Sequence, residues 1–197
     1  CHLGGSSSLT AIRNGESIAC SLGMSPQSGL PHNNRVGDFD VFGLPVLLRE
    51  TGKSLEEILD ILANRSGLEG ISGHRDLRDI EAAATSGDAR SKLAIDVFVA
   101  SIRHYLGAFL LDLGGADAIV FTGGIGENSS WIRSETCRDL EWFGISLDPE
   151  KNAKGPAERR VSADGSRVEI WTVPTNEELV VARQSQALLE SGARSSA

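Results

Sequence analysis

Hydrophobic and polar positions follow the two-residue period of strands in some parts of this chain and the three-to-four-residue period of helices in others. The strand-like part near the amino end predicts a hairpin. Apolar residues at 9–12 and 17–19 flank Asn14-Gly15. A type I′ turn requires positive φ at both of its central residues, which Asn and Gly tolerate best. We therefore expect two antiparallel strands here. Residues 25–40 follow without either period, and a loop of this length is more often functional than idle.

Helix signals occupy the middle of the chain. Ser54 followed by Glu57 forms a capping box, which predicts a helix to about Asn64. A second helix is expected within residues 75–85. Asp88 then opens a long helix that ends at Gly114-Gly115. Apolar residues three and four positions apart predict the buried stripe of this long helix. The residues of the stripe are Leu93, Val97, Phe98, Ile102, Tyr105, Phe109 and Leu113.

Strands and helices alternate in the last part of the sequence. Ala118–Phe121 is a continuous apolar run, which is typical of a strand covered on both faces. A helix at 130–140, a strand at 168–173 and a closing helix at 176–189 are expected to follow. This alternation predicts an α/β fold.

Composition and charge narrow the class of protein. The chain has 197 residues, 40% of them hydrophobic, which is enough for one core. Its formal net charge of −8 argues against nucleic acid as a partner. No apolar run approaches the ~18 residues of a membrane span, and no signal-peptide pattern is present. We therefore expect no membrane partner.

The cysteines and histidines point to a reducing compartment. Three Cys without a CxxC pair and four His without a close pair argue against a disulfide framework or a zinc site. A cytoplasmic location fits this pattern best. Because the sequence opens at Cys1 and not at Met, we expect it to be part of a longer polypeptide.

The strongest candidate for a functional site is the glycine turn Gly123–Asn128, which follows the apolar strand and precedes a helix. Glycine lets the backbone approach a ligand closely, and a helix N-terminus offers unpaired N–H groups. Open α/β sheets bind ligands beyond the carboxyl ends of their strands. The alternative is a tight turn that needs glycine for packing alone. A dinucleotide fingerprint fits poorly because Ser129 stands where its third glycine belongs, and no Gly-Lys-Ser/Thr of a Walker loop occurs.

Two further segments offer groups that suit a phosphate. His2 and the Gly and Ser residues at 4–8 supply backbone N–H groups and hydroxyls without bulk. Alternatively, this stretch is only a flexible linker. Arg35 is a candidate to stabilise charge on a transferring phosphoryl group, and the alternative is a surface pair with Asp38.

Two acidic segments have equally plain structural explanations. Residues 76–79, Asp-Leu-Arg-Asp, are typical of a solvated helix face. Glu177 and Glu178 complement the dipole at the start of the closing helix, and a carboxylate there also suits Mg²⁺.

In this order and at these spacings, the segments resemble the acetokinase family of carboxylate kinases over nearly the whole chain. The matching motifs lie at residues 2–4, 35–40, 66–68, 70–72, 76–79, 121–128 and 174–178. The resemblance implies a ribonuclease-H-like fold of the actin-like ATPase and sugar-kinase superfamily, with a mixed sheet and flanking helices. It implies that residues 1–190 are the carboxy-terminal, nucleotide-binding domain and that 191–197 are a flexible tail. The implied partners are the amino-terminal half of the same enzyme and a second copy in a homodimer.

The implied reaction is reversible phosphoryl transfer from ATP to a short-chain, acetate-like carboxylate, giving ADP and an acyl phosphate, with Mg²⁺. The transition-state arginine maps onto Arg35 and the magnesium-associated glutamate onto Glu177. The implied nucleotide-binding residues are His2, Leu3, Gly4, Gly5, Ser6, Asp76, Leu77, Arg78, Gly124, Ile125, Gly126, Glu127 and Asn128. In the family the acyl pocket and further catalytic side chains lie in the amino-terminal half. We therefore expect this chain alone to bind nucleotide without turnover.

This chain departs from the family pattern in two places. The family usually has Asn and Gly after His-Leu-Gly, where this chain has Gly5 and Ser6. The family loop commonly reads Gly-Thr-Arg-Ser-Gly-Asp, where residues 33–38 read Asn-Asn-Arg-Val-Gly-Asp. The first departure removes an amide near the phosphates. Two alternatives stay open: a catalytically inactive module of the same fold, and a related phosphotransferase with another substrate, such as a sugar.

Overall fold

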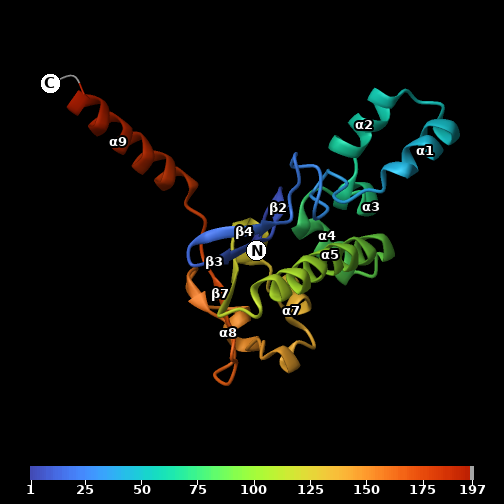
Figure 1. The fold of residues 1–197 in the computed structure, drawn as a ribbon. Helices are drawn as coiled ribbons and strands as arrows, with labels where there is room; N and C mark the ends of the chain where they lie inside the picture. The colour runs from blue at the N-terminus through green and yellow to red at the C-terminus, as the bar shows by residue number, and fades with distance from the viewer. Residues whose placement is uncertain (196–197) are drawn as a thin grey trace.

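A computed structural model describes residues 1–195, in which strands and helices alternate as an α/β fold with mixed sheets (Figure 1). The strands are β1 (His2–Leu3), β2 (Ser7–Ser8), β3 (Thr10–Arg13), β4 (Glu16–Cys20), β5 (Ala118–Phe121), β6 (Arg159–Arg160) and β7 (Glu169–Thr172). The α-helices are α1 (Leu44–Thr51), α2 (Leu55–Asn64), α3 (Gly67–Ser72), α4 (Leu77–Thr85), α5 (Ala89–Leu113), α6 (Gly123–Asn128), α7 (Ser130–Cys137), α8 (Pro149–Ala153) and α9 (Glu177–Ser195). Two 3₁₀ helices lie at Val41–Gly43 and Glu141–Phe143. The predicted α/β class is confirmed.

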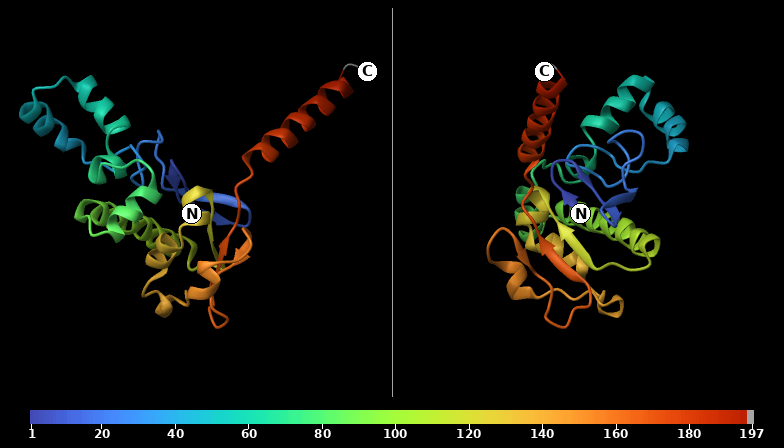
Figure 2. Two further views of the ribbon diagram at one scale, coloured as in Figure 1. Left: turned by 180° about the vertical axis from the view of Figure 1, so that it is seen from behind. Right: turned by 60° about the vertical axis from the view of Figure 1, so that its left-hand side comes forward.

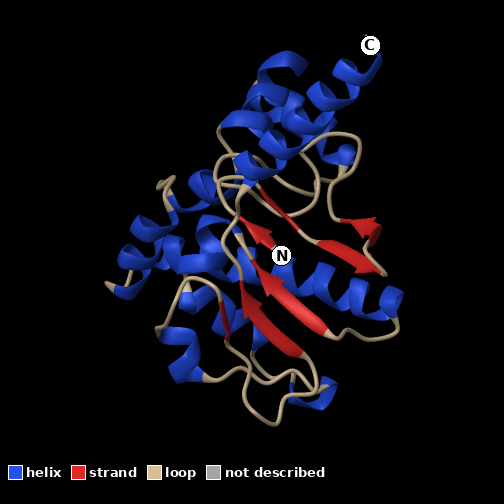
Figure 3. Cartoon of the chain, turned by 90° about the vertical axis from the view of Figure 1, so that its left-hand side faces the viewer, coloured by secondary structure: helices blue, strands red, loops and turns tan. Residues whose placement is uncertain are grey.

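The strands connect into one mixed arrangement (Figure 3). β1 pairs antiparallel with β2, which leads through Leu9 into β3, and β3 pairs antiparallel with β4. β5 pairs in parallel with β7, and β6 pairs antiparallel with β7. β1 joins β5 in parallel, because Leu3 N donates to Thr122 O at 2.8 Å and Thr122 N to Cys1 O at 2.9 Å. The order across the molecule is therefore β4, β3 with β2, β1, β5, β7, β6.

The segments with local sequence signals adopt the predicted structures. Asn14 and Gly15 have φ of 54° and 82° between β3 and β4, as a type I′ turn requires. At the start of α2, Glu57 N donates to Ser54 Oγ at 3.2 Å and Ser54 N donates to Glu57 Oε2 at 2.8 Å. The hairpin and the capping box are confirmed.

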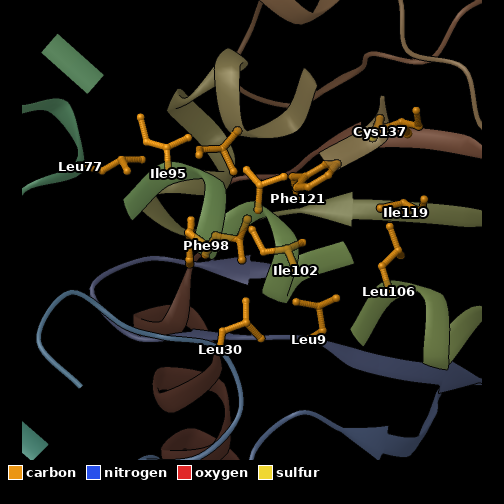
Figure 4. Packing of buried hydrophobic residues seen from close by; sticks show 14 of the residues in the cluster. Leu9, Leu30, Leu77, Ile95, Phe98, Ile102, Leu106, Ile119, Phe121 and Cys137 are labelled. Carbon is orange, nitrogen blue, oxygen red and sulfur yellow. The ribbon is translucent and has the colours of Figure 1, made fainter. Parts of the chain in front are cut away.

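Helix α5 forms the centre of the hydrophobic core (Figure 4). It is capped by Asp88 and ends at Gly114, whose φ is 72°, as predicted. Its buried stripe is rotated from the predicted one. The buried residues are Ser91, Ala94, Ile95, Phe98, Val99, Ile102, Leu106 and Phe109. Leu93 is 53% exposed, because α3, α4, α7 and β3 cover the adjacent face of the helix.

The length and composition of α5 also fit a membrane span, contrary to the expectation that no stretch of the chain does. Length and composition are the only features that suggest this. The buried stripe of α5 packs against Leu9, Leu30 and Phe121 in the core (Figure 4). Amphipathic burial of this kind is what a core helix requires.

Three predicted elements differ from the structure. In β5, Ile119 and Phe121 are buried while Ala118 and Val120 are exposed, so within the described residues only one face is covered and the prediction of two was wrong. The helix predicted at 130–140 ends at Cys137. The closing helix, α9, continues to Ser195 and occupies most of the predicted flexible tail; residues 196–197 lie outside the described part.

Two helical segments project from the body of the molecule. Figures 1 and 2 show α1 and α2 as an arm on one side and α9 extending away on another. The core lies between α5 and the strands. Leu3 of β1, Leu77 of α4 and Phe121 of β5 belong to it.

Candidate functional site

One cleft brings the predicted nucleotide-binding segments together. Its Asp76 side has a volume of about 640 Å³ and is lined by Gly4, Gly5, Asn33, Asp76, Leu77, Arg78, Glu81, Gly124, Ile125, Asn128 and Ser129. Its Thr175 side has a volume of about 540 Å³ and is lined by His2, Gly4, Gly5, Gly123, Gly124, Glu127, Thr175, Asn176 and Glu178. The two sides adjoin, because Gly4, Gly5 and Gly124 line both.

The predicted glycine turn is the short helix α6, and its glycines have different reasons to be there. Gly123 has φ of 77°, and a Cβ at this position would lie 2.7 Å from Leu3 O. Backbone conformation and packing therefore both require glycine at 123. A Cβ at Gly124 would meet nothing within 4 Å, and its φ is not positive. Since the fold does not need glycine at 124, close approach of a ligand is the remaining physical reason for it.

A buried arginine hydrogen-bonds to the backbone carbonyls at the end of α6. Arg133 is 1% exposed, and its guanidinium donates to Gly126 O at 2.8 Å, Glu127 O at 2.9 Å and Asn152 Oδ1 at 2.7 Å. Burial lowers the pKa of Arg133 to about 10. The cation meets the carbonyl end of α6, where the peptide dipoles favour positive charge. Sequence reasoning missed Arg133, because a lone Arg in a helix gives no signal of burial.

The segment after β7 is tied to α6 through Thr175. Thr175 Oγ1 accepts from Gly123 N at 3.0 Å and lies 2.7 Å from Thr122 Oγ1, while Thr175 N donates to Glu127 Oε1 at 3.0 Å. Asn128 Nδ2 donates to Gly124 O at 2.8 Å. The side chains of Glu127 and Asn128 therefore fix α6 and the Thr175 segment in place.

The opposite wall of the Asp76 side is the start of α4. Asp76 caps this helix by accepting from Arg78 N at 2.9 Å, and it forms an ion pair with the Arg78 guanidinium at 2.5 Å. The hydrogen bonds from Arg78 lower the pKa of Asp76 to about 2. Ser129 Oγ donates to Glu81, which links α4 to the start of α7. The 76–79 segment is thus both a capped helix start and a cleft wall.

Arg35 lies beside the glycines of the amino-terminal turn. Its Nη1 donates to Ser6 Oγ at 3.0 Å. Asp38, the alternative partner of Arg35, instead accepts from Gly29 N at 2.8 Å and from Tyr105 Oη at 2.5 Å. The surface pair between Arg35 and Asp38 was therefore the wrong alternative.

A buried histidine, which the sequence analysis did not single out, joins the Arg35 loop to the same turn. His32 is 1% exposed, and its Nδ1 accepts from Ser7 N at 2.9 Å. Burial lowers the pKa of His32, and the positive charge of Arg35 lowers it further. The ring is thus held neutral as a hydrogen-bond acceptor. A lone His after a proline carries no sequence signal for this role.

Three of the predicted nucleotide-binding residues do not line the cleft. Leu3 is fully buried in the core, and Gly126 is buried with its carbonyl on Arg133. Both were predicted from their place inside a motif, and packing assigns them to the interior. Ser6 lies outside the lining residues and holds Arg35. The side chain of Glu177 lies outside the described residues, while the neighbouring Glu178 lines the Thr175 side.

A metal site made by this chain alone is not formed in the described residues. No group of three His, Cys, Asp or Glu side chains in this part of the chain is placed to hold an ion. The cleft offers backbone amides, the Arg78 guanidinium with Arg35 nearby, and the carboxylates of Asp76, Glu81, Glu127 and Glu178.

Comparison with known proteins identifies the family. The model of the acetokinase family matches residues 1–183. The chain belongs to the acetokinase family. It is 45% identical over 192 residues to an acetate kinase from Moorella thermoacetica, covering 97% of this chain and 48% of that protein. An acetate kinase from Leifsonia xyli is 46% identical over 192 residues, with the same two coverages.

Solved structures of acetokinases share the fold. The structure of Porphyromonas gingivalis acetate kinase superposes with a TM-score of 0.90 and 38% identity, covering 95% of this chain and 48% of that one. A propionate kinase from Francisella tularensis gives a TM-score of 0.86 and 36% identity, covering 92% of this chain and 46% of that one. The chain therefore spans about half the length of the relatives that it matches.

Proposed function

We propose that this acetokinase chain is the carboxy-terminal, nucleotide-binding half of an ATP-dependent kinase for acetate or a similar short-chain carboxylate. One observation carries the proposal. Gly4 and Gly5, Asp76 and Arg78, and Gly124, which are far apart in the sequence, line one cleft. Arg35 lies beside the cleft, on Ser6.

The strand order supports the assignment to the ribonuclease-H-like superfamily. Three consecutive antiparallel strands, formed by β1, β2 with β3, and β4, stand on one side, and β5 and β7 run parallel to β1 on the other. A mixed sheet with flanking helices is what the family resemblance implies for this superfamily. The cleft lies where β1 and β5 end, as expected for ligands of α/β sheets.

Phosphoryl transfer needs positioning and neutralisation of oxygen charge more than covalent chemistry. We assign the nucleoside to the Asp76 side, whose walls are α4 and α6. The phosphates then lie along Gly4 and Gly5, where backbone N–H groups and the Arg35 guanidinium are at hand. In this arrangement Arg35 stabilises the charge of the transferring group.

The Thr175 side fits Mg²⁺ bound together with phosphates. Mg²⁺ commonly takes one or two carboxylates and completes its shell with water and phosphate oxygens. Glu178 and Asn176 line the cleft on this side, and Glu177 is the neighbouring carboxylate that the family resemblance favours. The ion would neutralise phosphate charge there.

The acyl pocket and the remaining catalytic groups are assigned to the amino-terminal half, so the chain alone should bind nucleotide without turnover. A homodimer is part of the same proposal, by family resemblance. The test uses the full-length protein that contains this chain. We expect it to form acyl phosphate from ATP and acetate, trapped as the hydroxamate, while the isolated chain binds ADP in calorimetry and forms none.

A substrate panel separates this function from its alternatives. Phosphorylation of sugars, with no hydroxamate from acetate, propionate or butyrate, would assign the protein to another phosphotransferase. Nucleotide binding without any product would assign it to an inactive module. Hydroxamate formation by the isolated chain at the full-length rate would contradict the division of labour between the halves.

A further inference from the structure

The two departures from the family pattern lie next to each other in the wall of the cleft. Asn33 lines the Asp76 side, and its backbone N donates to Gly5 O at 3.3 Å. A Cβ built on Gly5 would have one neighbour within 4 Å, the Asn33 Nδ2 atom at 3.7 Å. The amide of Asn33 therefore stands directly in front of position 5.

The Asn33 amide has no partner of its own among the described residues. Its Oδ1 is buried without a hydrogen bond, and its Nδ2 forms none that the structure records. Oδ1 is an acceptor and cannot bind a phosphate oxygen, so the Nδ2 donor is the group of Asn33 that is available to a phosphate. The neighbouring Asn34, by contrast, donates from Nδ2 to Asn64 O at 3.3 Å, away from the cleft. Asn33 is thus the member of this pair that is poised toward a ligand.

Backbone geometry does not explain the glycine at position 5. Gly5 does not have positive φ, so any residue can adopt its conformation. A Cβ alone would make only an ordinary contact there. A side chain longer than Ala, however, would compete with the Asn33 amide for the same space. Gly5 is therefore best understood together with Asn33.

At positions 5 and 33, Asn and Gly have changed places relative to the family pattern. The family usually has Asn where this chain has Gly5, and Gly where this chain has Asn33. We propose that the Asn33 amide replaces the one lost at position 5 and binds the phosphate end of the nucleotide from the neighbouring loop of the cleft wall. Nδ2 donates to a phosphate oxygen, a charge-assisted bond. The inference rests on the proposed function, and it makes Gly5 a compensated change, not a sign of lost activity.

The test is a double-mutant cycle in the full-length protein, with kcat and KM for ATP from the hydroxamate assay and ADP affinity from calorimetry. Asn33→Gly removes the amide, and we expect kcat/KM for ATP to fall about tenfold, as for one hydrogen bond to a charged group. Gly5→Asn crowds the amide, and a fall of about tenfold is expected for that overlap as well. The double variant Gly5→Asn/Asn33→Gly restores the family pattern, and we expect it to return within about threefold of wild type.

Asn34→Gly is the matched control, because it makes the same loop equally flexible and removes an amide that faces away from the cleft. We expect its ATP kinetics to match those of wild type. If the double variant is as impaired as the product of the single effects, or if Asn34→Gly is as impaired as Asn33→Gly, the exchange is refuted. If wild type binds ADP yet forms no acyl phosphate, the proposed function fails, and the same cycle measured by ADP affinity still decides the inference.

Discussion

The two glycine-rich walls of the cleft are held in different ways. The α6 wall is fixed from three sides, by the Leu3 carbonyl against Gly123, by Arg133 beneath the helix and by Thr175 at its start. The wall formed by residues 4–7 accepts one hydrogen bond each from Arg35 and Asn33 and donates one, from Ser7 N, to His32.

This difference matches where the sequence follows the family and where it departs from it. A wall that packing determines cannot change one residue without loss of stability. A wall held by a few hydrogen bonds can lose an amide side chain from one segment and gain one from a neighbouring segment. One departure from the family pattern, at Gly5 and Ser6, lies on the second wall, and the other, at residues 33–38, lies in the loop that contacts it. Substitutions at the packed positions of the first wall, such as Gly123, should therefore change stability, and those on the second wall should change activity.

The largest expected effect is on activity, at Arg35. Arg35→Ala in the full-length protein should lower kcat about 1000-fold, the scale of an arginine that stabilises transferring phosphate. The free energy of unfolding should change little, since among the described residues the Arg35 side chain hydrogen-bonds only to the Ser6 hydroxyl. Steady-state kinetics and urea denaturation measure the two. Arg65→Ala is the control, because Arg65 forms an exposed pair with Asp60 near the same loop; equal kinetics of the two variants would contradict the assignment.

The next effect is on stability, at Arg133. Arg133→Met removes the donor for Gly126 O, Glu127 O and Asn152 Oδ1 and should cost about 3 kcal/mol of unfolding free energy. Arg138→Ala, just after the end of the same helix, removes exposed pairs with Glu135 and Asp139 and should cost less than about 0.5 kcal/mol. Urea denaturation of both variants makes the comparison. If Arg133→Met lowers the free energy of unfolding as little as Arg138→Ala does, the hydrogen bonds from Arg133 are not needed to hold α6.

A smaller and sharper contrast lies within α6. Gly123→Ala places a Cβ 2.7 Å from Leu3 O at a positive φ and should destabilise the protein by about 2 kcal/mol. Gly124→Ala meets no atom within 4 Å and should leave stability nearly unchanged while weakening ADP binding. Thermal unfolding and calorimetry test the pair. Strong ADP binding by Gly124→Ala would show that the ligand does not approach this residue closely.

The smallest effect concerns pH, at His32. Burial depresses the pKa of His32 in the folded state below its ordinary value of 6.5, so the unfolded chain binds the proton more readily. The contribution of neutral His32 is present above pH 6.5 and is lost as the pH falls through 6.5 toward the lower folded value. His32→Asn, which keeps an acceptor for Ser7 N, should flatten the pH dependence of unfolding in this range. His104→Asn, at an exposed ring, is the matched control for replacing an imidazole with an amide.

Residue order by itself determined the elements whose signals are local. Asn14-Gly15 formed the hairpin turn, Ser54 and Glu57 formed the capping box, and Asp88 and Gly114 bounded α5. In each case the deciding interactions lie within a few residues along the chain. The α/β alternation and the collinear motifs were likewise readable, and the family they indicated is confirmed.

Tertiary structure decided what is buried and which motif residues face the cleft. The stripe of α5 turned away from Leu93, and β5 was covered on one face only, because segments distant in sequence set which sides are packed. Leu3 and Gly126 went into the interior, and Glu127 was used to hold Thr175. The positions of the Asn33 and Arg133 side chains are set by contacts with residues up to tens of positions away in the sequence. Burial and pairing are properties of contacts between distant segments, and no local pattern in the sequence encodes them.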